Sequence, residues 1–267
     1  MITLSISNPK NGVGKTATTH ALGQALSSVY KRGVLLLDMD PQSKLTEACG
    51  IKDSARRSMA EVIGGIGPVY VNGRRFEIQD AIVNLSTGLY LAPSDAALAA
   101  SEMGLMVRLS RENVLKNALA SVNNNFDVCL IDCPANLGLL TVNALVASDA
   151  IIIPTQPTIA DLRSLRLFLE CIHQIQDEIN TNLKVLGILI TFFEARQVTH
   201  QRSLDAMRLA KLPLLPVMIS KSMKIADAAQ KGQSIITYAP DTPPAHSYRE
   251  LAEAIEIRLR MEDERYR

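Results

Sequence analysis

Four residues near the start of the chain have the types and the spacing that bind phosphate: Gly12, Gly14, Lys15 and Thr16. Glycines lack a Cβ, so their backbone amides can lie close to an anion. Lys15 can reach terminal phosphates, and the Thr16 hydroxyl can ligate Mg²⁺. An apolar run precedes these residues and a helical pattern follows them, which predicts a phosphate-binding loop between a strand and a helix. Pro9 replaces the first glycine of the strict GxxxxGK[ST] pattern.

Acidic residues end two further apolar runs. Asp38 and Asp40 follow one run, and Asp132 ends another. Ligands of an open parallel sheet bind outside the carboxyl ends of its strands, which is also where the phosphate loop must lie. We therefore expect these carboxylates to face the phosphates and Mg²⁺, with Asp132 holding a water of the metal shell opposite Thr16. An exposed acidic turn is the alternative for Asp38 and Asp40.

The phosphate loop and the acidic residues can form one site only if strands and helices bring them to the same edge of a sheet. Short apolar runs rich in Ile, Leu and Val are typical of strands covered on both faces, and longer helical patterns lie between them. The alternation predicts an α/β fold, in which one doubly wound, mostly parallel sheet is flanked by helices. We expect residues 1–267 to form a single domain, with 63–73 as a surface connection. The expected strands are 2–7, 34–37, 89–92, 128–131, 150–153 and 185–192, and the expected helices are 16–30, 96–123 and 162–178.

The composition excludes several classes of protein. The 267 residues are 47% hydrophobic and 21% charged with a formal net charge of +1, which excludes a disordered chain, a collagen and a wholly basic nucleic-acid coat. The four cysteines form no CxxC pair, so we expect reduced thiols rather than a zinc site or a disulfide framework. No apolar run reaches the roughly 18 residues that a membrane span needs, so we expect a cytoplasmic protein.

The phosphate-loop segment has a family resemblance. Eight consecutive residues are similar to the deviant Walker A motif of the ParA/MinD superfamily, K-G-G-V-G-K-T-[TS]: Lys10, Asn11, Gly12, Val13, Gly14, Lys15, Thr16 and Ala17. The resemblance implies a P-loop ATPase whose residues 10–17 bind ATP with Mg²⁺. It also implies that the signature lysine, Lys10, reaches the nucleotide of a partner subunit in an ATP-bound homodimer. Asn11 and Ala17 depart from the motif; Asn tolerates left-handed backbone better than most residues.

Two further segments resemble motifs of the same family. Residues 38–42 match the D-x-D-P-Q element of ParA proteins, which implies that Asp40 positions the attacking water and that Asp38 supports it or the metal shell. Asp132 has Walker B form, and the residues after it resemble the switch II stretch. Catalysis of this kind consists of positioning and charge neutralisation, so without an obvious strong base we expect slow hydrolysis that a partner stimulates.

A basic segment lies near the C-terminus. Residues 196–232 contain seven basic side chains against two acidic ones. Such a segment can neutralise DNA phosphates without reading bases, although a solvated helical face is the alternative reading. Resemblance to DNA-contacting segments of ParA proteins favours Arg196, Lys221 and Lys224 as contacts to double-stranded DNA.

The resemblance leaves the cargo open. It implies a small ParA, located at the nucleoid, that partitions a plasmid or chromosome through a ParB-like adaptor or positions a protein body such as a carboxysome. A MinD-like membrane-associated ATPase is disfavoured because acidic residues occur throughout the last sixteen residues. An iron-protein-like Fe–S reductase is disfavoured because Cys133 directly follows the Walker B acid.

Overall fold

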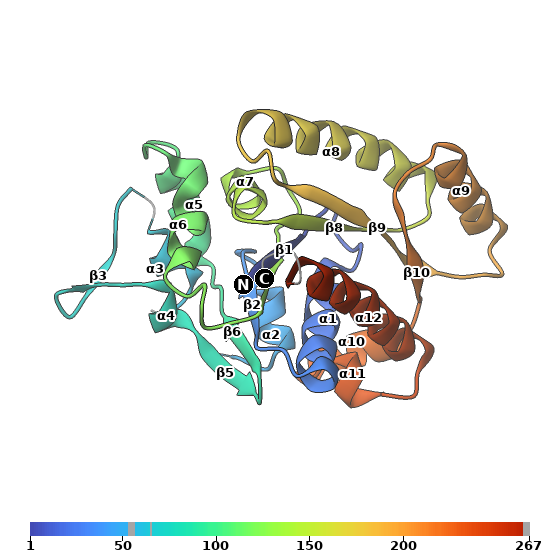
Figure 1. Cartoon of the computed structure of the whole chain (residues 1–267), viewed down its shortest axis with the longest axis horizontal. Coiled ribbons are helices and arrows are strands. Elements are labelled where there is room, and N and C mark those ends of the chain that lie inside the picture. The colour runs from blue at the N-terminus through green and yellow to red at the C-terminus, as the bar shows by residue number, and fades with distance from the viewer. Residues whose placement is uncertain (53–56, 65, 264–267) are drawn as a thin grey trace.

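A sheet of eight strands runs through the middle of the protein. The computed structural model describes residues 1–52, 57–64 and 66–263 (Figure 1). Within the sheet the strand order is β10-β9-β8-β1-β7-β2-β6-β5, and every neighbouring pair is parallel except β5 with β6. The strands are β1 (Ile2–Ile6), β2 (Val34–Asp38), β5 (Val83–Ser86), β6 (Leu89–Ala92), β7 (Val128–Asp132), β8 (Ala150–Thr155), β9 (Lys184–Phe193) and β10 (Leu214–Ser220).

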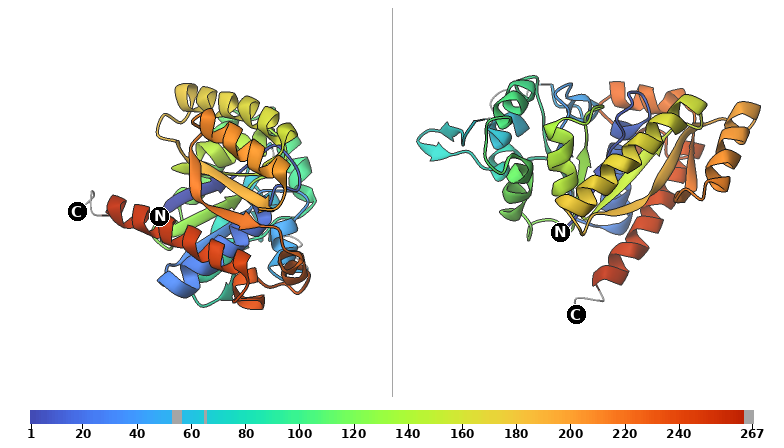
Figure 2. Two further views of the ribbon diagram at one scale, coloured as in Figure 1. Left: turned by 90° about the vertical axis from the view of Figure 1, so that its right-hand side faces the viewer. Right: turned by 90° about the horizontal axis from the view of Figure 1, so that it is seen from above.

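Helices cover both faces of this sheet (Figures 1 and 2). On one side α1 and α12 pack side by side, while α7, α8 and α9 lie on the other side and α3 to α6 form a group at one end. The helices are α1 (Lys15–Tyr30), α2 (Lys44–Ala48), α3 (Met59–Ile63), α4 (Ile78–Ala81), α5 (Ala97–Leu105), α6 (Val114–Ala120), α7 (Leu139–Val146), α8 (Ile159–Glu178), α9 (Val198–Leu209), α10 (Met223–Gln230), α11 (Ile235–Tyr238) and α12 (Pro243–Asp263), with the short 3₁₀ helix η1 (Arg111–Asn113) before α6.

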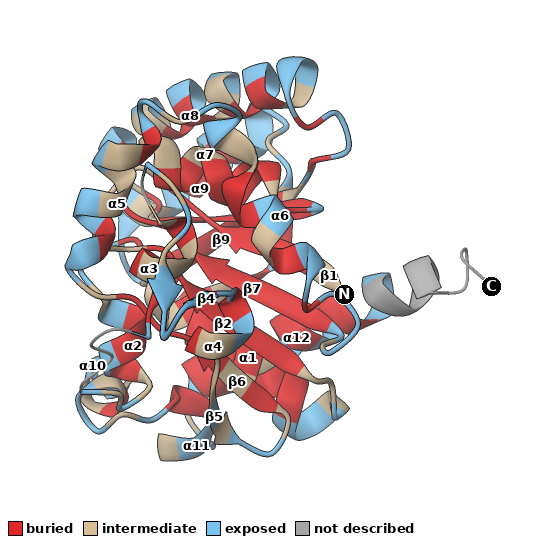
Figure 3. Ribbon diagram, turned by 90° about the vertical axis from the view of Figure 1, so that its left-hand side faces the viewer, coloured by how far each residue is buried: buried red, intermediate tan, exposed pale blue. Residues whose placement is uncertain are grey.

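Alternation along the strands divides the core between the two faces. Leu36 and Leu130 pack with α1 and α12, whereas their neighbours Leu35 and Ile131 pack against the opposite helices. Successive side chains of a strand point to opposite faces, so strands buried on both sides are apolar throughout. The central strands are accordingly buried along their length (Figure 3) and rich in Ile, Leu and Val, although β1 also carries the buried polar residues Thr3 and Ser5.

The first and last helices are joined by polar contacts as well. The Tyr248 hydroxyl of α12 lies 3.3 Å from the Thr18 hydroxyl of α1, and both side chains are buried. At the other end of α1, the Arg32 guanidinium makes two 3.0 Å contacts with the Glu256 carboxylate. These contacts fix α12 against α1, the helix that follows the phosphate loop.

The structure confirms the predicted fold class and the six predicted strands, with ends shifted by one or two residues. The prediction of one helix was wrong, and the predicted surface connection, although exposed over most of its described residues, contains a short strand that was not predicted. The expected helix 96–123 is interrupted between α5 and α6, where the Asn143 side chain of α7 donates to Arg111 O at 2.9 Å and accepts from Leu115 N at 3.1 Å. The expected connection 63–73 contains β3 (Tyr70–Val71), which forms a two-stranded hairpin with β4 (Arg74–Arg75) that projects from the body (Figure 1). Strands β5 and β10 were not predicted.

Candidate functional site

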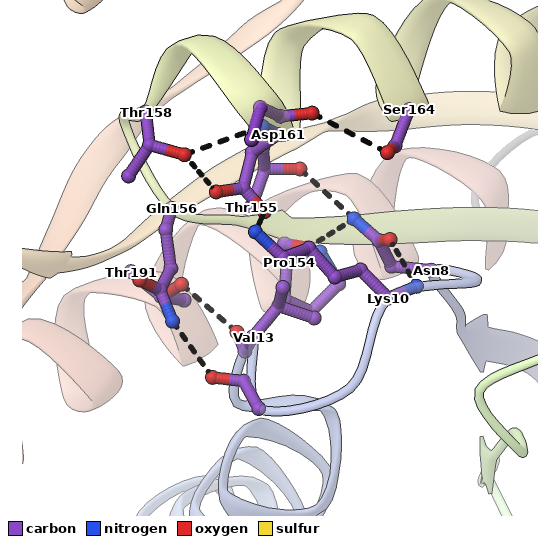
Figure 4. Close-up of polar contacts among 12 residues, drawn as sticks. Asn8, Lys10, Val13, Pro154, Thr155, Gln156, Thr158, Asp161, Ser164 and Thr191 are labelled. Carbon is purple, nitrogen blue, oxygen red and sulfur yellow. Dashed lines mark hydrogen bonds and ion pairs between the residues drawn. The ribbon is translucent and has the colours of Figure 1, made fainter.

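The glycine-rich loop lies between β1 and α1, as the sequence predicts. Gly12 and Gly14 adopt left-handed backbone with φ of 72° and 88°, whereas Asn11 does not, so Asn11 replaces a glycine without strain. Two side chains hold the loop: Gln156 Nε2 donates to Gly12 O at 2.8 Å, and Thr191 Oγ1 donates to Val13 O at 2.9 Å (Figure 4). A Cβ built on Gly12 would meet nothing within 4 Å, so this side of the loop is open.

Lys15 closes the loop from inside. Its ammonium donates to Asn8 O at 2.9 Å and to Lys10 O at 3.0 Å. The side chain is buried, and desolvation lowers its pKa from the ordinary value, while the nearby Asp132 carboxylate acts in the opposite direction. A buried ammonium that donates hydrogen bonds to loop carbonyls is stabilised further by an anion placed in the loop. The position of Lys15 thus fits a phosphate ligand.

Thr16 and Asp132 meet at the carboxyl ends of the central strands. The Thr16 hydroxyl donates to Asp132 Oδ2 at 2.7 Å. In the part of the chain that the structure describes, the buried Oδ1 of Asp132 has no hydrogen-bond partner. Burial and the neighbouring Asp38 raise the pKa of Asp132 well above its ordinary value. An unsatisfied buried carboxylate oxygen beside a hydroxyl suits a hydrated Mg²⁺, which prefers oxygen ligands and would neutralise the charge.

The two acids after β2 have different surroundings. Asp38 is fully buried and accepts hydrogen bonds from Thr46 N at 2.9 Å, Thr46 Oγ1 at 2.7 Å and Asp40 N at 3.1 Å. Burial raises the pKa of Asp38 to about 6. Asp40 is half-buried, and its carboxylate accepts from Gln42 N at 2.9 Å. Asp38 thus orders α2 and the turn that presents Asp40, while Asp40 lies nearer to solvent.

Lys10 contacts a residue that sequence reasoning missed. Its ammonium lies 2.8 Å from Asp161 Oδ1, and Asp161 is buried near the start of α8 (Figure 4). The Thr158 hydroxyl caps the helix by accepting from Asp161 N at 3.2 Å and is also hydrogen-bonded to the Asp161 carboxylate. The pattern Thr-x-x-Asp before an apolar run is a capping signature and is visible in the sequence. In this structure Lys10 is therefore paired within its own subunit.

The candidate DNA-contacting residues lie on neighbouring segments. Strands β9 and β10 are adjacent and parallel, with Phe193 opposite Ser220, so the residues that follow them emerge at the same edge. Arg196, Lys221 and Lys224 are all exposed. The Lys221 ammonium lies 3.3 Å from the Glu194 carboxylate, which reduces the positive charge of this edge. Thr191, at the end of β9, connects the same edge to the phosphate loop through Val13 O.

The described residues contain neither a membrane-spanning helix nor a cluster of metal-binding side chains. Among residues 1–52, 57–64 and 66–263, no helix is long and apolar enough to cross a membrane. Within the same ranges there is no group of three or more His, Cys, Asp and Glu residues placed to hold a metal ion. Cys133, which directly follows Asp132, is buried with 1% of its surface exposed.

A parallel sheet with a glycine-rich loop between β1 and α1, and with acids at the ends of β2 and β7, defines a P-loop nucleoside triphosphatase. A family model described as an AAA domain matches residues 1–185. The sporulation initiation inhibitor protein Soj of Bacillus subtilis is 34% identical over 254 residues, which cover 94% of this chain and 97% of Soj. The chain belongs to the ParA/MinD superfamily of ATPases and is close to ParA and Soj.

Solved structures agree with this assignment. Cobyrinic acid a,c-diamide synthase from Mycobacterium smegmatis, with a bound ATP analogue and magnesium, has a TM-score of 0.81 and 33% identity, covering 96% of this chain and 94% of that one. A variant of McdA from Cyanothece in complex with ATP has a TM-score of 0.81 and 26% identity, covering 96% of both chains. The family predicted from the phosphate-loop motif is therefore confirmed.

Proposed function

We propose that this protein is an ATP-dependent dimerisation switch that binds double-stranded DNA without sequence specificity and partitions or positions a cargo. The observation that carries this proposal is the position of Asp132 beside the phosphate loop. Its Oδ2 accepts a hydrogen bond from Thr16, while its buried Oδ1 has no partner among the described residues. ATP with Mg²⁺ is the ligand of such a site, and structural neighbours hold an ATP analogue or ADP with magnesium. We further propose that residues 1–267 form one ATPase domain of a cytoplasmic, nucleoid-associated protein.

The residues of the loop divide the binding of the nucleotide. Residues 10–17 surround the phosphates, and Lys15 exchanges its contacts with loop carbonyls for contacts with phosphate oxygens. The Thr16 hydroxyl would ligate Mg²⁺, and Asp132 would hold a water of the metal shell. When bound, the metal neutralises phosphate charge, which supports attack by water on the terminal phosphate.

The carboxylates after β2 act on the attacking water. Asp40 lies nearer to solvent than Asp38 and orients the water, while Asp38 fixes the turn through Thr46. Orientation of the attacking water without a strong general base gives slow ATP hydrolysis. A ParB-like or other adaptor is expected to complete the site and stimulate hydrolysis. In the dimer Lys10 leaves Asp161 and reaches the nucleotide of the partner subunit.

The edge formed by the ends of β9 and β10 contacts DNA. Arg196, Lys221 and Lys224 are exposed there and neutralise backbone phosphates. Removing one phosphate contact reduces the slope of log K against log salt by about 0.9 for duplex DNA. Soj and ParA relatives, named for sporulation control and chromosome partitioning, favour a chromosome or plasmid as the cargo.

Retention on DNA tests this proposal. The protein is expected to bind DNA of unrelated sequences equally, only with ATP and Mg²⁺, and less as salt increases. Arg196→Ala and Lys224→Ala should each weaken binding and reduce the salt slope. The matched control Arg166→Ala, which removes the same charge from an exposed position on α8, should not. ATP-independent binding would contradict the switch, and cosedimentation with anionic vesicles would favour a MinD-like protein instead.

Hydrolysis provides the second test. Asp40→Ala should bind ATP, form dimers and stay on DNA, because only the orientation of water is lost. Rapid turnover by this variant would remove Asp40 from its role. An Fe–S chromophore in the purified protein would favour the reductase alternative.

A further inference from the structure

A backbone contact joins the turn after α2 to the turn after α10. Gly50 lies in the first turn and Gly232 in the second, and both have left-handed backbone, with φ of 83° and 66°. A Cβ built on Gly232 would lie 2.7 Å from the Gly50 Cα and 3.1 Å from the Gly50 nitrogen. Left-handed backbone after a helix accounts for a glycine at each position, but it does not require the two turns to touch. We call this contact the glycine joint.

On one side of the glycine joint, α2 is tied to the nucleotide site. The Asp38 carboxylate at the end of β2 accepts hydrogen bonds from the Thr46 nitrogen and hydroxyl of α2, at 2.9 Å and 2.7 Å. Asp38 is also paired with Asp132 across the neighbouring strands β2 and β7, and Met39 N donates to Asp132 O at 2.9 Å. Nucleotide and Mg²⁺ beside Asp132 therefore change the surroundings of the segment that holds α2.

On the other side, α10 carries part of the DNA-contacting edge. Lys224 lies in its first turn, and Lys221 directly precedes Ser222, the residue that caps this helix. Lys221 N donates to Phe193 O at 3.3 Å, so the start of α10 is attached to the end of β9. An eight-residue helix is about 12 Å long and moves as one body. A displacement at the Gly232 end therefore tilts α10 and changes the position of Lys224.

We propose that the glycine joint transmits the state of the nucleotide site to the DNA-contacting edge by setting the tilt of α10. The inference rests on the proposed function, because it names the contact through which nucleotide controls DNA affinity. Helices α2 and α10 pack together (Figure 3), and at the joint backbone meets backbone. Such a contact has no side-chain rotamer that could absorb a displacement, so a movement of α2 is passed on to α10.

Gly232→Ala tests the joint, because the added methyl group forces the two turns apart. The DNA response is the affinity for a duplex of arbitrary sequence with a non-hydrolysable ATP analogue and Mg²⁺, divided by the affinity without nucleotide. Fluorescence anisotropy should show a response at least tenfold smaller than that of wild type. The affinity for the analogue without DNA, and the dimer dissociation constant from sedimentation velocity, should stay within twofold of wild type.

Gly73→Ala is the matched control. Gly73 also has left-handed backbone, with φ of 75°, but a Cβ there would meet nothing within 4 Å among the described residues. This variant therefore introduces the same backbone strain without a close contact, and its DNA response should equal that of wild type. A variant that only damages the DNA-contacting edge would lower DNA affinity equally with and without nucleotide, which leaves the response unchanged.

Two further measurements locate the coupling. By reciprocity, DNA should raise the affinity of wild type for the analogue, and this gain should fall at least tenfold in Gly232→Ala. In hydrogen exchange, the analogue should change the rates of residues 44–50 and 223–232 at least twofold in wild type, whereas in Gly232→Ala only residues 44–50 should respond.

A second variant acts at the other end of the connection. Thr46→Val removes the hydroxyl that donates to Asp38 but keeps the shape of the side chain. Its DNA response should be at least threefold smaller than that of wild type, and this result decides the question if Gly232→Ala does not fold.

Three results would overturn the inference. The first is a wild-type DNA response in Gly232→Ala, or in Thr46→Val where that variant is decisive. The second is a loss of dimerisation as large as the loss of DNA response, which would place the effect in the association of two copies. Either result leaves the proposed function intact. The third is a wild-type chain that binds the analogue without any gain in DNA affinity, which overturns the proposed function and this inference together.

Discussion

Replacing Asp38 by Asn should change how the stability of the nucleotide-free protein depends on pH. Burial raises the pKa of Asp38 to about 6, above its ordinary value of 3.8. The folded state therefore holds a proton between about pH 4 and 6 that the unfolded chain has released. An acid with a raised folded pKa makes the folded state less stable as pH rises through this window, and the loss is complete above the folded pKa.

The size of the effect follows from the pKa difference. One pKa unit corresponds to about 1.4 kcal/mol, so ionising Asp38 in the folded protein costs about 3 kcal/mol at pH 7.5, and about half of this change occurs above pH 5. Asn carries no charge and avoids this cost. It keeps an oxygen for Thr46 but presents an amide to Asp40 N, which loses one hydrogen bond worth about 1 kcal/mol. Asp38→Asn is therefore expected to be about 2 kcal/mol more stable than wild type at pH 7.5 and close to wild type at pH 5.

Urea unfolding in EDTA at a series of pH values from 5 to 8 measures this difference. The control is Asp127→Asn, because the Asp127 carboxylate is exposed and also accepts from a backbone amide, that of Gly33 at 2.7 Å. Its profile should run parallel to that of wild type. If the difference in unfolding free energy between Asp38→Asn and wild type is the same at pH 5 and pH 7.5, the reasoning from burial is refuted.

Three further predictions concern the site and its supports. Thr16→Ala should weaken binding of ATP with Mg²⁺ by at least tenfold and binding without Mg²⁺ much less, measured by calorimetry; equal losses would contradict its role at the metal. Asp161→Asn should free Lys10 and strengthen ATP-dependent dimerisation in sedimentation experiments, and an unchanged dimer would show that their ion pair does not compete with the dimer. Gly232→Ala should lower the unfolding free energy by about 1–3 kcal/mol, because the new Cβ would lie 2.7 Å from the Gly50 Cα in a left-handed conformation; wild-type stability in urea unfolding would exclude a close contact there.

Local sequence patterns predicted most of the sheet and the position of the site. Apolar runs identified the central strands, and the rule that ligands bind at the carboxyl ends of parallel strands placed Asp38 and Asp132 beside the phosphate loop. The structure brings Thr16 and Asp132 together over 116 positions of sequence, as this rule requires. The roles of these residues in binding and hydrolysis stay predictions.

Contacts between distant segments were the part that the sequence could not predict. The interruption between α5 and α6 depends on Asn143, whose partners are fixed only when α7 packs beside them. The partner of Lys10 depends on where α8 begins in space, although a capping pattern from Thr158 to Asp161 marks the first turn of a helix. The edge strand β5 is short and half exposed, with an alternation too brief to separate it from a loop.

The order in which the chain is synthesised gives the pairing of α1 and α12 a consequence for folding. The phosphate loop and α1 leave the ribosome well before α12, yet the apolar side of α1 faces Tyr248 and the rest of α12. Until α12 emerges, the apolar side of α1 is not packed against it, and the nascent chain exposes this apolar surface. We conclude that the nucleotide site cannot reach its final stability before α12 has been synthesised.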